Sequence, residues 1–396
     1  MEPEKEGGRK LRIVQLCAVD FTMRQFIAPL ALALSADGHQ VVCACTPGIH
    51  WEELRAMGLR LHAVSIARSG NPIRAARSVL RIARWLRRAR PDVLHVHTPV
   101  ASMIGRLAGA LAGVPVVVYT AHGFYFHDRM PAIRRLPHIA LERVFGWLCH
   151  YLFCVSAEDL STAKRLGIGP RHGRFHTPNG ADHCRFDPAA IPEGTRERIR
   201  DEFGIPADAR VVAIMGRLVR EKGYFEFFRA ACALAPRYPG AHFLAIGDTV
   251  ASEHDDAKAE ILRMAQAPEL KGRVHFAGLR SDVPELLAAS DIFCLPSYRE
   301  GMPVSIVEAM LMGLPTVTTR IRGCRELIED GRFGLLVKPG DAAELERALE
   351  QLLGDESATL VLGREAMLHA RAHLTQDRAM ERVVHLYRRI ARERFG

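Results

Sequence analysis

Short apolar runs alternate with longer amphipathic stretches along most of the chain. Runs rich in Val, Ile, Leu and Phe predict buried strands, and stretches with apolar residues every three or four positions predict helices. In the first half, the predicted strands cover residues 11–18, 41–45, 61–66, 92–97, 115–120 and 151–156. The predicted helices cover residues 23–36, 72–90, 100–112, 132–149 and 158–166. Strands that alternate with helices are typical of βαβ units and of a parallel sheet covered on both faces.

The same pattern restarts after a turn at Pro178-Asn179-Gly180 and a polar stretch to about residue 209. Predicted strands then cover residues 211–215, 242–246, 274–277, 292–295, 316–319 and 335–337. Predicted helices cover residues 224–235, 257–265, 283–289, 341–353, 356–372 and 376–394, in addition to one that begins near residue 303. We therefore expect an α/β protein with two doubly wound halves and a boundary near residue 185.

The stretch from Asp291 to Gly313 holds the most informative chemistry. Its strand leads into a polar loop, and Pro303 opens the next helix, since proline suits the first helical turn. A strand, a loop and a helix N-terminus form the place where open α/β sheets bind phosphorylated ligands. Glu300 lies in the loop and Glu308 lies further along the helix. Both could be surface acids, but a glutamate in a mostly apolar helix needs a partner.

A basic pair follows the strand predicted at 211–215. Arg217 and Lys222 lie in the loop at the carboxyl end of this strand. Arginine binds phosphate through a fork of N–H groups and lysine binds it as a point charge, so the pair can meet a diphosphate from two directions. The alternative is a surface loop in which Lys222 pairs with Glu221 or Glu226.

These two stretches carry a family resemblance. The run E-G-x-P-x-x-x-x-E-A-M that begins at Glu300 resembles the E-x7-E signature of retaining glycosyltransferases of family four, and residues 216–223 resemble their G-R-L-x-x-x-K-G motif. The resemblance implies a GT-B fold, in which two Rossmann-like domains face each other across a cleft. It also implies an acceptor domain at residues 1–185, completed by a crossover helix at about 376–396, and a nucleotide-sugar donor domain at 186–375.

The resemblance further implies roles for individual residues. Arg217 and Lys222 would bind the donor diphosphate, Glu308 the ribose hydroxyls, and Glu300 the donor sugar. The implied donor-binding set is Gly216, Arg217, Lys222, Glu300, Gly301, Met302, Pro303, Val304 and Glu308. The implied catalytic set is Glu300, His122, Arg217 and Lys222.

His122 stands in a T-A-H-G-F run directly after a predicted strand. A lone histidine is often structural, but relatives with this run place the histidine near the donor sugar, so the resemblance implies that His122 contacts a sugar hydroxyl. Phe124 and Tyr125 are either core residues or contacts of a lipid acceptor. Arg24, near the start of the first helix, is a candidate for binding an acceptor phosphate.

The sequence favours chemistry without a metal ion. No Asp-x-Asp motif follows a predicted strand, and His95 and His97 have the spacing of a metal pair without an evident third ligand. Arg217, Lys222 and the positive end of the helix at Pro303 must then stabilise the departing diphosphate. The first strand-to-helix loop lacks glycine, which excludes a G-x-G-x-x-G fingerprint. We expect no cofactor besides a nucleotide-sugar co-substrate, for which the resemblance implies a UDP-sugar.

The composition predicts a cytoplasmic protein. Hydrophobic residues make up 48% of the 396 residues and charged residues 25%, as in ordinary globular proteins. None of the apolar runs approaches the roughly 20 residues of a membrane span, and the N-terminus lacks the apolar core of a signal peptide. The nine cysteines contain no CxxC pair, which indicates reduced thiols.

A net charge of +9 directs attention to anionic partners. Five arginines share one face of the helix predicted at 72–90: Arg74, Arg77, Arg81, Arg84 and Arg88. This stripe suits an anionic membrane surface, and an ordinary solvated helix face is an equal alternative. No aromatic–basic interleaving supports a nucleic-acid partner. We expect peripheral association with the inner face of the cytoplasmic membrane.

Together these features predict a retaining, metal-independent glycosyltransferase. It would move a hexosyl or N-acetylhexosaminyl group from a nucleotide sugar to a lipid-linked saccharide or polyprenyl acceptor in surface polysaccharide synthesis. One alternative is a nucleotide-sugar epimerase of the same fold, and another is a non-catalytic membrane-associated partner of a polysaccharide assembly complex. Intact Arg217, Lys222, Glu300 and Glu308 argue against a non-catalytic copy.

Overall fold

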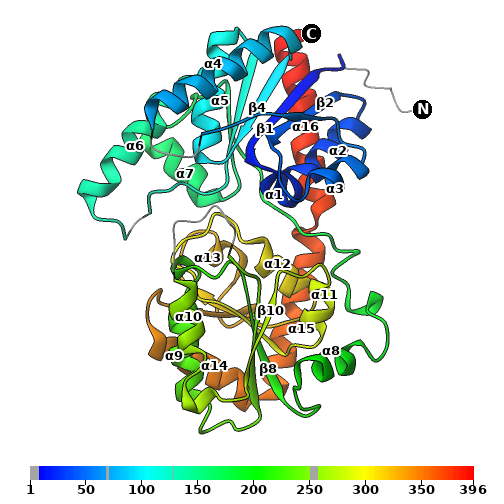
Figure 1. Cartoon of the computed structure of the whole chain (residues 1–396), viewed down its shortest axis with the longest axis vertical. Coiled ribbons are helices and arrows are strands. Elements are labelled where there is room, and N and C mark those ends of the chain that lie inside the picture. Colours follow the sequence, from blue (N-terminus) through cyan, green and yellow to red (C-terminus); the bar gives the residue numbers. More distant parts are fainter. Residues whose placement is uncertain (1–8, 68–70, 128, 250–256) are drawn as a thin grey trace. The chain divides into compact units, whose positions relative to one another are not determined.

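The chain divides into two compact units (Figure 1). The computed structural model describes residues 9–67, 71–127, 129–249 and 257–396. One unit comprises Met1–Pro178 with Asp377–Gly396, and the other comprises Asn179–Gln376. The first unit therefore ends a few residues before the boundary expected near 185, and the last helix returns to it.

The first unit is built on a parallel sheet, in which seven strands lie within the described residues in the order β3-β2-β1-β4-β5-β6-β7. The strands are β1 Arg12–Val19, β2 Gln40–Thr46, β3 Leu61–Ala63, β4 Val93–His97, β5 Val116–Ala121, β6 Tyr151–Cys154 and β7 Arg174–His176. Every residue of β4, β5 and β6 is buried, which explains their continuous apolar runs. The sequence did not predict β7, because this edge strand is short and only half-buried.

Helices cover both faces of this sheet. They are α1 Asp20–Thr22, the π-helical turn η1 Met23–Ile27, α2 Ala28–Ala36, α3 Trp51–Ala56, α4 Pro72–Ala89, α5 Pro99–Ala112, α6 Ala132–Gly146, α7 Ala157–Leu166 and α16 Gln376–Phe395. Helices α4, α5 and α7 bury apolar side chains against one face. Helices α2, α3 and α16 bury theirs against the other, and Figure 1 shows the red α16 beside the blue β2 and α2.

Two predicted helices differ from the structure. The helix expected at 23–36 begins as the π-helical turn η1 and becomes α-helical only from Ala28. Pro29, at the start of α2, has no N–H to donate to the preceding turn. The helix expected at 132–149 ends at Gly146, and Val144, one of its apolar residues, is 66% exposed. Among the described residues, no helix is long and apolar enough to cross a membrane.

The second unit has a parallel sheet of six described strands in the order β10-β9-β8-β11-β12-β13. They are β8 Arg210–Met215, β9 Ala241–Ile246, β10 Val274–Gly278, β11 Ile292–Leu295, β12 Thr316–Thr319 and β13 Gly334–Val337. The helices are α8 Thr195–Phe203, α9 Tyr224–Leu234, α10 Lys258–Met264, α11 Val283–Ala288, α12 Val304–Leu311, α13 Cys324–Leu327, α14 Ala342–Gly354 and α15 Glu356–His373, with 3-10 turns η2 Pro188–Ala190, η3 Arg220–Lys222 and η4 Pro268–Leu270. The sequence did not predict α8, because this polar helix buries only Thr195, Ile199 and Arg200.

Both sheets reverse their strand order at one point. In the first sheet β1 pairs with β4, and in the second β8 pairs with β11. Open α/β sheets bind ligands outside the carboxyl ends of the strands at such a switch point. The fold therefore directs attention to the loops that follow these strands.

Candidate functional site

Two loops meet at the switch point of the second sheet. Residues 216–223 follow β8, and residues 296–303 follow its neighbour β11. Gly223 has a φ of 78°, and a Cβ on it would lie 2.1 Å from the carbonyl oxygen of Pro296. Gly323, in the loop after β12, likewise has a φ of 78°, and its Cβ would lie 2.0 Å from the carbonyl oxygen of Gly301. The loops therefore pack backbone against backbone, and only glycine permits this contact.

Lys222 and Glu300 meet between these loops. The lysine Nζ lies 2.5 Å from Oε1 of Glu300, and the Ser297 hydroxyl donates a hydrogen bond to the same oxygen at 2.7 Å. The Lys222 side chain is 16% exposed and that of Glu300 is 10% exposed. A charge pair this far from bulk water interacts more strongly than a surface pair.

Glu221 and Glu226, which the sequence offered as alternative partners of Lys222, are engaged elsewhere. Glu221 pairs with Arg299, whose Nε lies 2.5 Å from a carboxylate oxygen. Glu226 accepts a hydrogen bond from the Tyr298 hydroxyl at 2.7 Å. The structure therefore does not support the alternative in which Lys222 pairs with Glu221 or Glu226, because Lys222 pairs with Glu300 on the other loop.

Gly216 and Arg217 begin the loop after β8. A Cβ on Gly216 would lie 3.3 Å from Cδ of Lys222, so the lysine stem passes close over this glycine. Arg217 is half-buried, and its carbonyl accepts a hydrogen bond from the Val219 N–H at 2.8 Å. Both basic side chains thus start from one short, closed turn.

Residues 301–304 lead into α12. Pro303 is the N-cap with a ψ of 112°, so the helix begins at Val304, one residue later than the sequence suggested. The Asn179 side-chain amide donates to the carbonyl of Met302 at 3.0 Å, which holds this segment in place. The N–H groups of the first turn of α12 form the positive end of the helix dipole.

Glu308 lies on α12 among apolar residues and is only 9% exposed. Burial raises the pKa of its carboxyl group to about 7, and the charge of Arg185 opposes this shift. Within the described residues, the Glu308 carboxyl makes no hydrogen bond, and its oxygens are not among the fully buried side-chain atoms without a partner. A buried carboxyl group without a partner is costly, so its position points to a ligand with hydroxyl donors.

In the first unit, His122 ends a chain of buried hydrogen bonds. Its Nε2 lies 3.1 Å from Nδ1 of His97, and Nε2 of His97 lies 2.8 Å from Oε1 of Gln15. The Gln15 amide reaches the hydroxyl of Tyr387 on α16, which lies 2.8 Å from Nδ1 of His95. These contacts use both ring nitrogens of His95 and His97, since His95 also contacts Thr120 at 2.6 Å.

The directions of these hydrogen bonds follow from the Gln15 amide. Its carbonyl oxygen accepts only, so Nε2 of His97 carries a proton and Nδ1 of His97 accepts from His122. Burial lowers the pKa of His122 to about 4 and that of His95 to about 3, so both rings are neutral near pH 7. His122 is then protonated on Nε2, and its Nδ1 presents a hydrogen-bond acceptor.

The three residues expected to bind an acceptor have different surroundings. Arg24 is paired with Glu53, with its Nε 2.7 Å from a carboxylate oxygen. Phe124 is 3% exposed and stacks on Phe126, so it is a core residue and the expected acceptor contact does not suit it. Tyr125 is 51% exposed, with its ring 4.6 Å from that of His138 on α6.

Sequence reasoning missed several members of these constellations. Ser297 carries no signal of its own, and its role depends on the fold of the 296–303 loop. Gln15 could have been found, because it is a polar residue in the middle of an apolar strand and is fully buried. Among the described residues, no group of three or more His, Cys, Asp and Glu is arranged to hold a metal ion.

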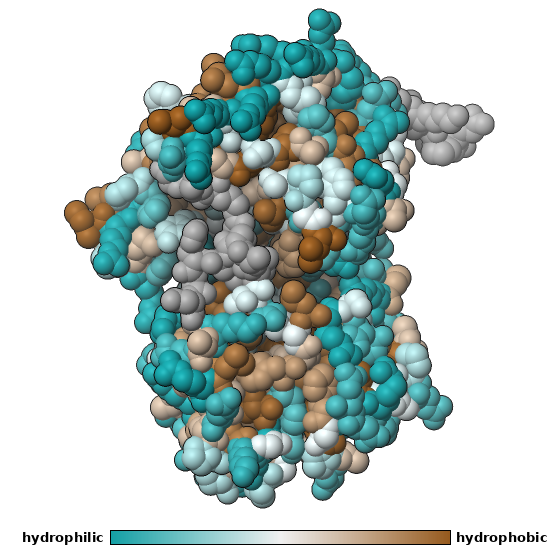
Figure 2. All heavy atoms as spheres, viewed as in Figure 1, coloured by the Kyte–Doolittle hydropathy of each residue, from teal (hydrophilic) through white to brown (hydrophobic). Residues whose placement is uncertain are grey.

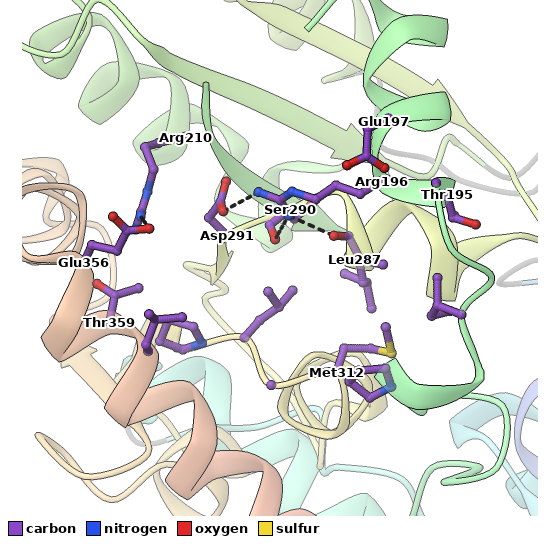
Figure 3. A pocket seen from close by; sticks show the side chains of 18 of the residues that line it. Thr195, Arg196, Glu197, Arg210, Leu287, Ser290, Asp291, Met312, Glu356 and Thr359 are labelled. Atoms are coloured by element: carbon purple, nitrogen blue, oxygen red, sulfur yellow. Dashed lines mark hydrogen bonds and ion pairs between the residues drawn. The ribbon is translucent and has the colours of Figure 1, made fainter. Parts of the chain in front are cut away.

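A cavity of about 490 Å³ lies at the amino ends of the strands of the second sheet (Figure 3). It is lined by Arg210 at the start of β8 and by Asp291 and Pro315, which precede β11 and β12. Because the strands are parallel, their amino ends lie away from the loops that hold Lys222 and Glu300. This cavity is therefore separate from the switch-point site.

Four charged residues of this cavity form two ion pairs. Arg196 lies 2.7 Å from Asp291, and Arg210 lies 3.0 Å from Glu356, as Figure 3 shows. These pairs tie α8 and α15 to the amino ends of the strands. We therefore interpret these charged residues as structural contacts between helices and sheet.

Comparison with known proteins gives two family matches. Residues 195–369 match the family described as glycosyl transferases group 1, and residues 23–183 match glycosyltransferase family 4. Over 296 residues, or 74% of each chain, the sequence is 31% identical to an Escherichia coli protein named UDP-Gal:alpha-D-GlcNAc-diphosphoundecaprenol alpha-1,3-galactosyltransferase. It is 26% identical over 385 residues, covering 96% of this chain and 99% of the other, to the Campylobacter jejuni N,N'-diacetylbacillosaminyl-diphospho-undecaprenol alpha-1,3-N-acetylgalactosaminyltransferase.

Solved structures share the fold. Anabaena HepE, in complex with UDP and glucose, superposes with a TM-score of 0.80 at 21% identity, over 95% of this chain and 99% of the other. The two parallel sheets and their helices match this GT-B architecture, which confirms the fold class expected from the sequence.

Proposed function

Because the chain belongs to the group 1 glycosyl transferases, we propose that it moves a sugar from a nucleotide-sugar donor to a lipid-linked acceptor in the synthesis of a surface polysaccharide. The observation that carries this proposal is the shielded Lys222–Glu300 pair at the switch point of the second sheet. The names of the Escherichia coli and Campylobacter jejuni relatives support a UDP-sugar donor carrying a hexose or N-acetylhexosamine, and an acceptor linked to undecaprenyl diphosphate.

We assign the donor diphosphate to Arg217, Lys222 and the first-turn N–H groups of α12. The Lys222 ammonium has three N–H donors and uses one on Glu300, so two remain for phosphate oxygens. Glu308 accepts hydrogen bonds from the ribose hydroxyls, which supplies the partner that its buried carboxyl group lacks within the described chain. Glu300, through its second oxygen, and the backbone of 301–304 bind the donor sugar.

We propose that transfer retains the configuration of the sugar. The acceptor hydroxyl attacks the anomeric carbon from the face that the diphosphate leaves, the bond to phosphate breaks, and the hydroxyl proton passes to the leaving phosphate oxygen. In this proposal Glu300 positions the sugar: Lys222 and Ser297 hold Oε1, and Oε2 accepts a hydrogen bond from a sugar hydroxyl. His122 accepts a hydrogen bond from a sugar hydroxyl through Nδ1.

The proposed reaction needs no metal ion. Negative charge grows on the diphosphate as the sugar departs, and Lys222, Arg217 and the dipole of α12 stabilise that charge in a partly dry site. Loss of one such group costs about 3–4 kcal/mol, or about 10²- to 10³-fold in kcat. We place the enzyme at the inner face of the cytoplasmic membrane, where a lipid-linked acceptor is available.

The experiment measures nucleoside diphosphate release from a panel of nucleotide sugars, with a chelator present and with or without a membrane lipid extract. We expect UDP release that depends on the acceptor and continues in the presence of the chelator. In Glu300→Gln the rate of release should fall by about 100-fold or more. Glu221→Gln is the matched control, since Glu221 lies in the same pair of loops but binds Arg299.

Other outcomes lead to other functions. Rearranged donor or release without any acceptor would indicate an epimerase or hydrolase. Absence of both release and nucleotide binding would indicate a non-catalytic partner. Release that stops with the chelator would overturn metal independence alone.

A further inference from the structure

The outward face of α6 is apolar. Ile133, Leu136, Val144 and Trp147 are 80%, 60%, 66% and 87% exposed, and Ala140 between them is also exposed. Steps of three, four, four and three residues place these five side chains in one stripe along the helix and its C-cap Trp147, which we call the α6 surface. In Figure 2, brown apolar atoms reach the surface where Figure 1 draws α6, with teal hydrophilic atoms beside them.

The inward face of the same helix combines a buried polar contact with the apolar Ile139, which packs against the core. The Glu142 carboxylate lies 3.5 Å from Arg106 of α5, a residue with no exposed surface, and accepts a hydrogen bond from the Tyr119 hydroxyl at 3.3 Å. The Arg106 guanidinium also lies over the ring of Phe145, 5.4 Å from its centre. These contacts fix the rotation of α6. A surface helix in water normally presents polar side chains outward, so the exposed apolar stripe of this helix indicates an apolar partner on its outer side.

Arginines border the α6 surface. At 100° per residue, Arg134 lies on one side of the stripe and Arg143 on the other, and both are exposed. Glu142 is the only acidic residue of α6, and it points inward. An apolar stripe with flanking arginines matches a helix that lies in the headgroup layer of an anionic bilayer, where long basic side chains reach the lipid phosphates.

We infer that the α6 surface docks on an anionic lipid bilayer and inserts its apolar side chains below the headgroups. This inference rests on the proposed function and deepens it, because it names the surface that brings the enzyme to a lipid-linked acceptor. Tyr125, the exposed candidate for acceptor binding, lies against His138 of the same helix.

The arginine stripe of α4 has a different part in this docking. Its five arginines are exposed as the sequence predicted, and Val79, Ile82, Ala83 and Leu86 are buried behind them. The exposed apolar side chains of α4, Ile73 and Leu80, are isolated within this basic face. Helix α4 therefore supplies long-range attraction to anionic lipid, while α6 supplies insertion.

A second copy of the chain is a poorer occupant of the α6 surface. A symmetric dimer would bring Arg134 and Arg143 of both copies to one seam, and α6 has no outward acidic residue to pair with them. A stripe of five side chains is also small beside the roughly 1,000 Å² that a stable interface needs.

The test is sedimentation of the full chain with vesicles of phosphatidylglycerol mixed equally with phosphatidylcholine, and with vesicles of phosphatidylcholine alone. We expect binding to the anionic vesicles that weakens as salt rises, and a loss of about tenfold or more in Val144→Glu. Val361→Glu is the matched control: Val361 is an exposed valine of helix α15, 62% exposed against 66% for Val144, and its variant should bind as the unchanged chain does.

Equal loss in both variants, or no vesicle binding by the unchanged chain, would overturn the inference. A change from dimer to monomer in Val144→Glu, measured by light scattering, would show that a second copy is the occupant and would also overturn it. Because Val144 is exposed, circular dichroism should show that its variant is folded.

Sugar transfer separates this inference from the proposed function. Val144→Glu should transfer sugar normally to acceptor dispersed in detergent and poorly to acceptor embedded in vesicles. Sugar transfer by a chain that does not bind vesicles would refute the docking surface and support the proposed function. Vesicle binding by a chain that transfers sugar to no acceptor would refute the proposed function and support the docking surface.

Discussion

The carboxyl group of Glu308 is buried in an otherwise apolar helix, and burial raises its pKa from 4.5 to about 7. Between these pH values the folded protein holds a proton that the unfolded chain releases. The free energy of unfolding therefore falls as pH rises through this window, by up to about 3 kcal/mol, and is level above it. We expect Glu308→Gln to remove this loss, so that the variant is more stable than the unchanged chain above pH 7.

Urea unfolding followed at several pH values measures this effect. The control is Glu269→Gln, since Glu269 is an exposed carboxylate in the turn η4 of the same unit. A Glu308→Gln variant with the same pH slope as the unchanged chain would contradict the prediction.

Gln15 orients the ring of His122 through His97. In Gln15→Leu, the buried Nε2–H of His97 has no acceptor, and we expect a loss of about 1–3 kcal/mol in the free energy of unfolding. The ring of His122 also loses its fixed protonation on Nε2, so kcat should fall more than KM changes. Gln40→Leu, at the exposed start of β2, is the control and should alter neither quantity.

Nitrogen chemical shifts in histidine-labelled protein give an independent readout. They should report His122 protonated on Nε2 in the unchanged chain and a mixture of both neutral forms in Gln15→Leu. A single unchanged form in both proteins would refute the orienting role.

Single residues show how far the sequence leads. Glu300, Lys222 and Arg217 were identified from their motifs, and the structure places them in loops at one switch point. The pairing of Lys222 with Glu300 could not be predicted, because they are 78 residues apart and the sequence offers the nearer Glu221 and Glu226 as partners. The fold decides this contact by setting two loops side by side.

At the scale of elements, the loop before α9 depends on Gly223. In Gly223→Ala, the added methyl group meets a carbonyl oxygen and the residue keeps a positive φ, so the loop must shift. We expect a larger loss of stability than in Gly204→Ala, where φ is 65° and no atom lies within 4 Å of the added group, so that only about 1 kcal/mol is lost.

The turnover number should also distinguish these two variants. Gly223→Ala displaces Lys222 from Glu300 and should lower kcat by about 10-fold or more, since misplacement of a charged group by 1 Å is costly. Gly204→Ala should retain full activity. Equal behaviour of the two in thermal unfolding and in turnover would contradict this reading of the loop contact.

Elements also differ in how readily their pattern predicts them. Strands β4, β5 and β11 were found nearly to the residue, because they are buried on both faces and their apolar runs are continuous. The rotation of α6 could not be predicted from its pattern. Its apolar residues do not define one buried face, and in the structure the buried Arg106 draws Glu142 inward while Val144 lies outside.

At the scale of the whole molecule, the first unit is assembled from two distant segments of the chain. Val383, Tyr387 and Ile390 of α16 are buried in its core with strands β1, β4 and β5. Each such side chain contributes about 1.5–3 kcal/mol, and the three together approach the stability of a typical domain.

We therefore expect residues 1–178 alone to be unstable or insoluble, and residues 179–376 alone to unfold cooperatively. Expression of the two fragments and thermal unfolding of the soluble material measure this difference. Co-expression of residues 1–178 with residues 377–396 should rescue solubility. A stable, cooperatively unfolding 1–178 fragment would show that α16 is dispensable for the first core.

The division of the first unit has a consequence for synthesis on the ribosome. Its first segment emerges long before α16, since about 200 residues lie between them, and translation at roughly 5–20 residues per second makes the delay roughly 10–40 s. During that interval the sheet face that will receive Tyr387 is exposed, while the second unit completes its own fold. The first unit to be synthesised is thus the last to be finished, and a nascent chain that stalls near residue 376 presents an open apolar surface to chaperones.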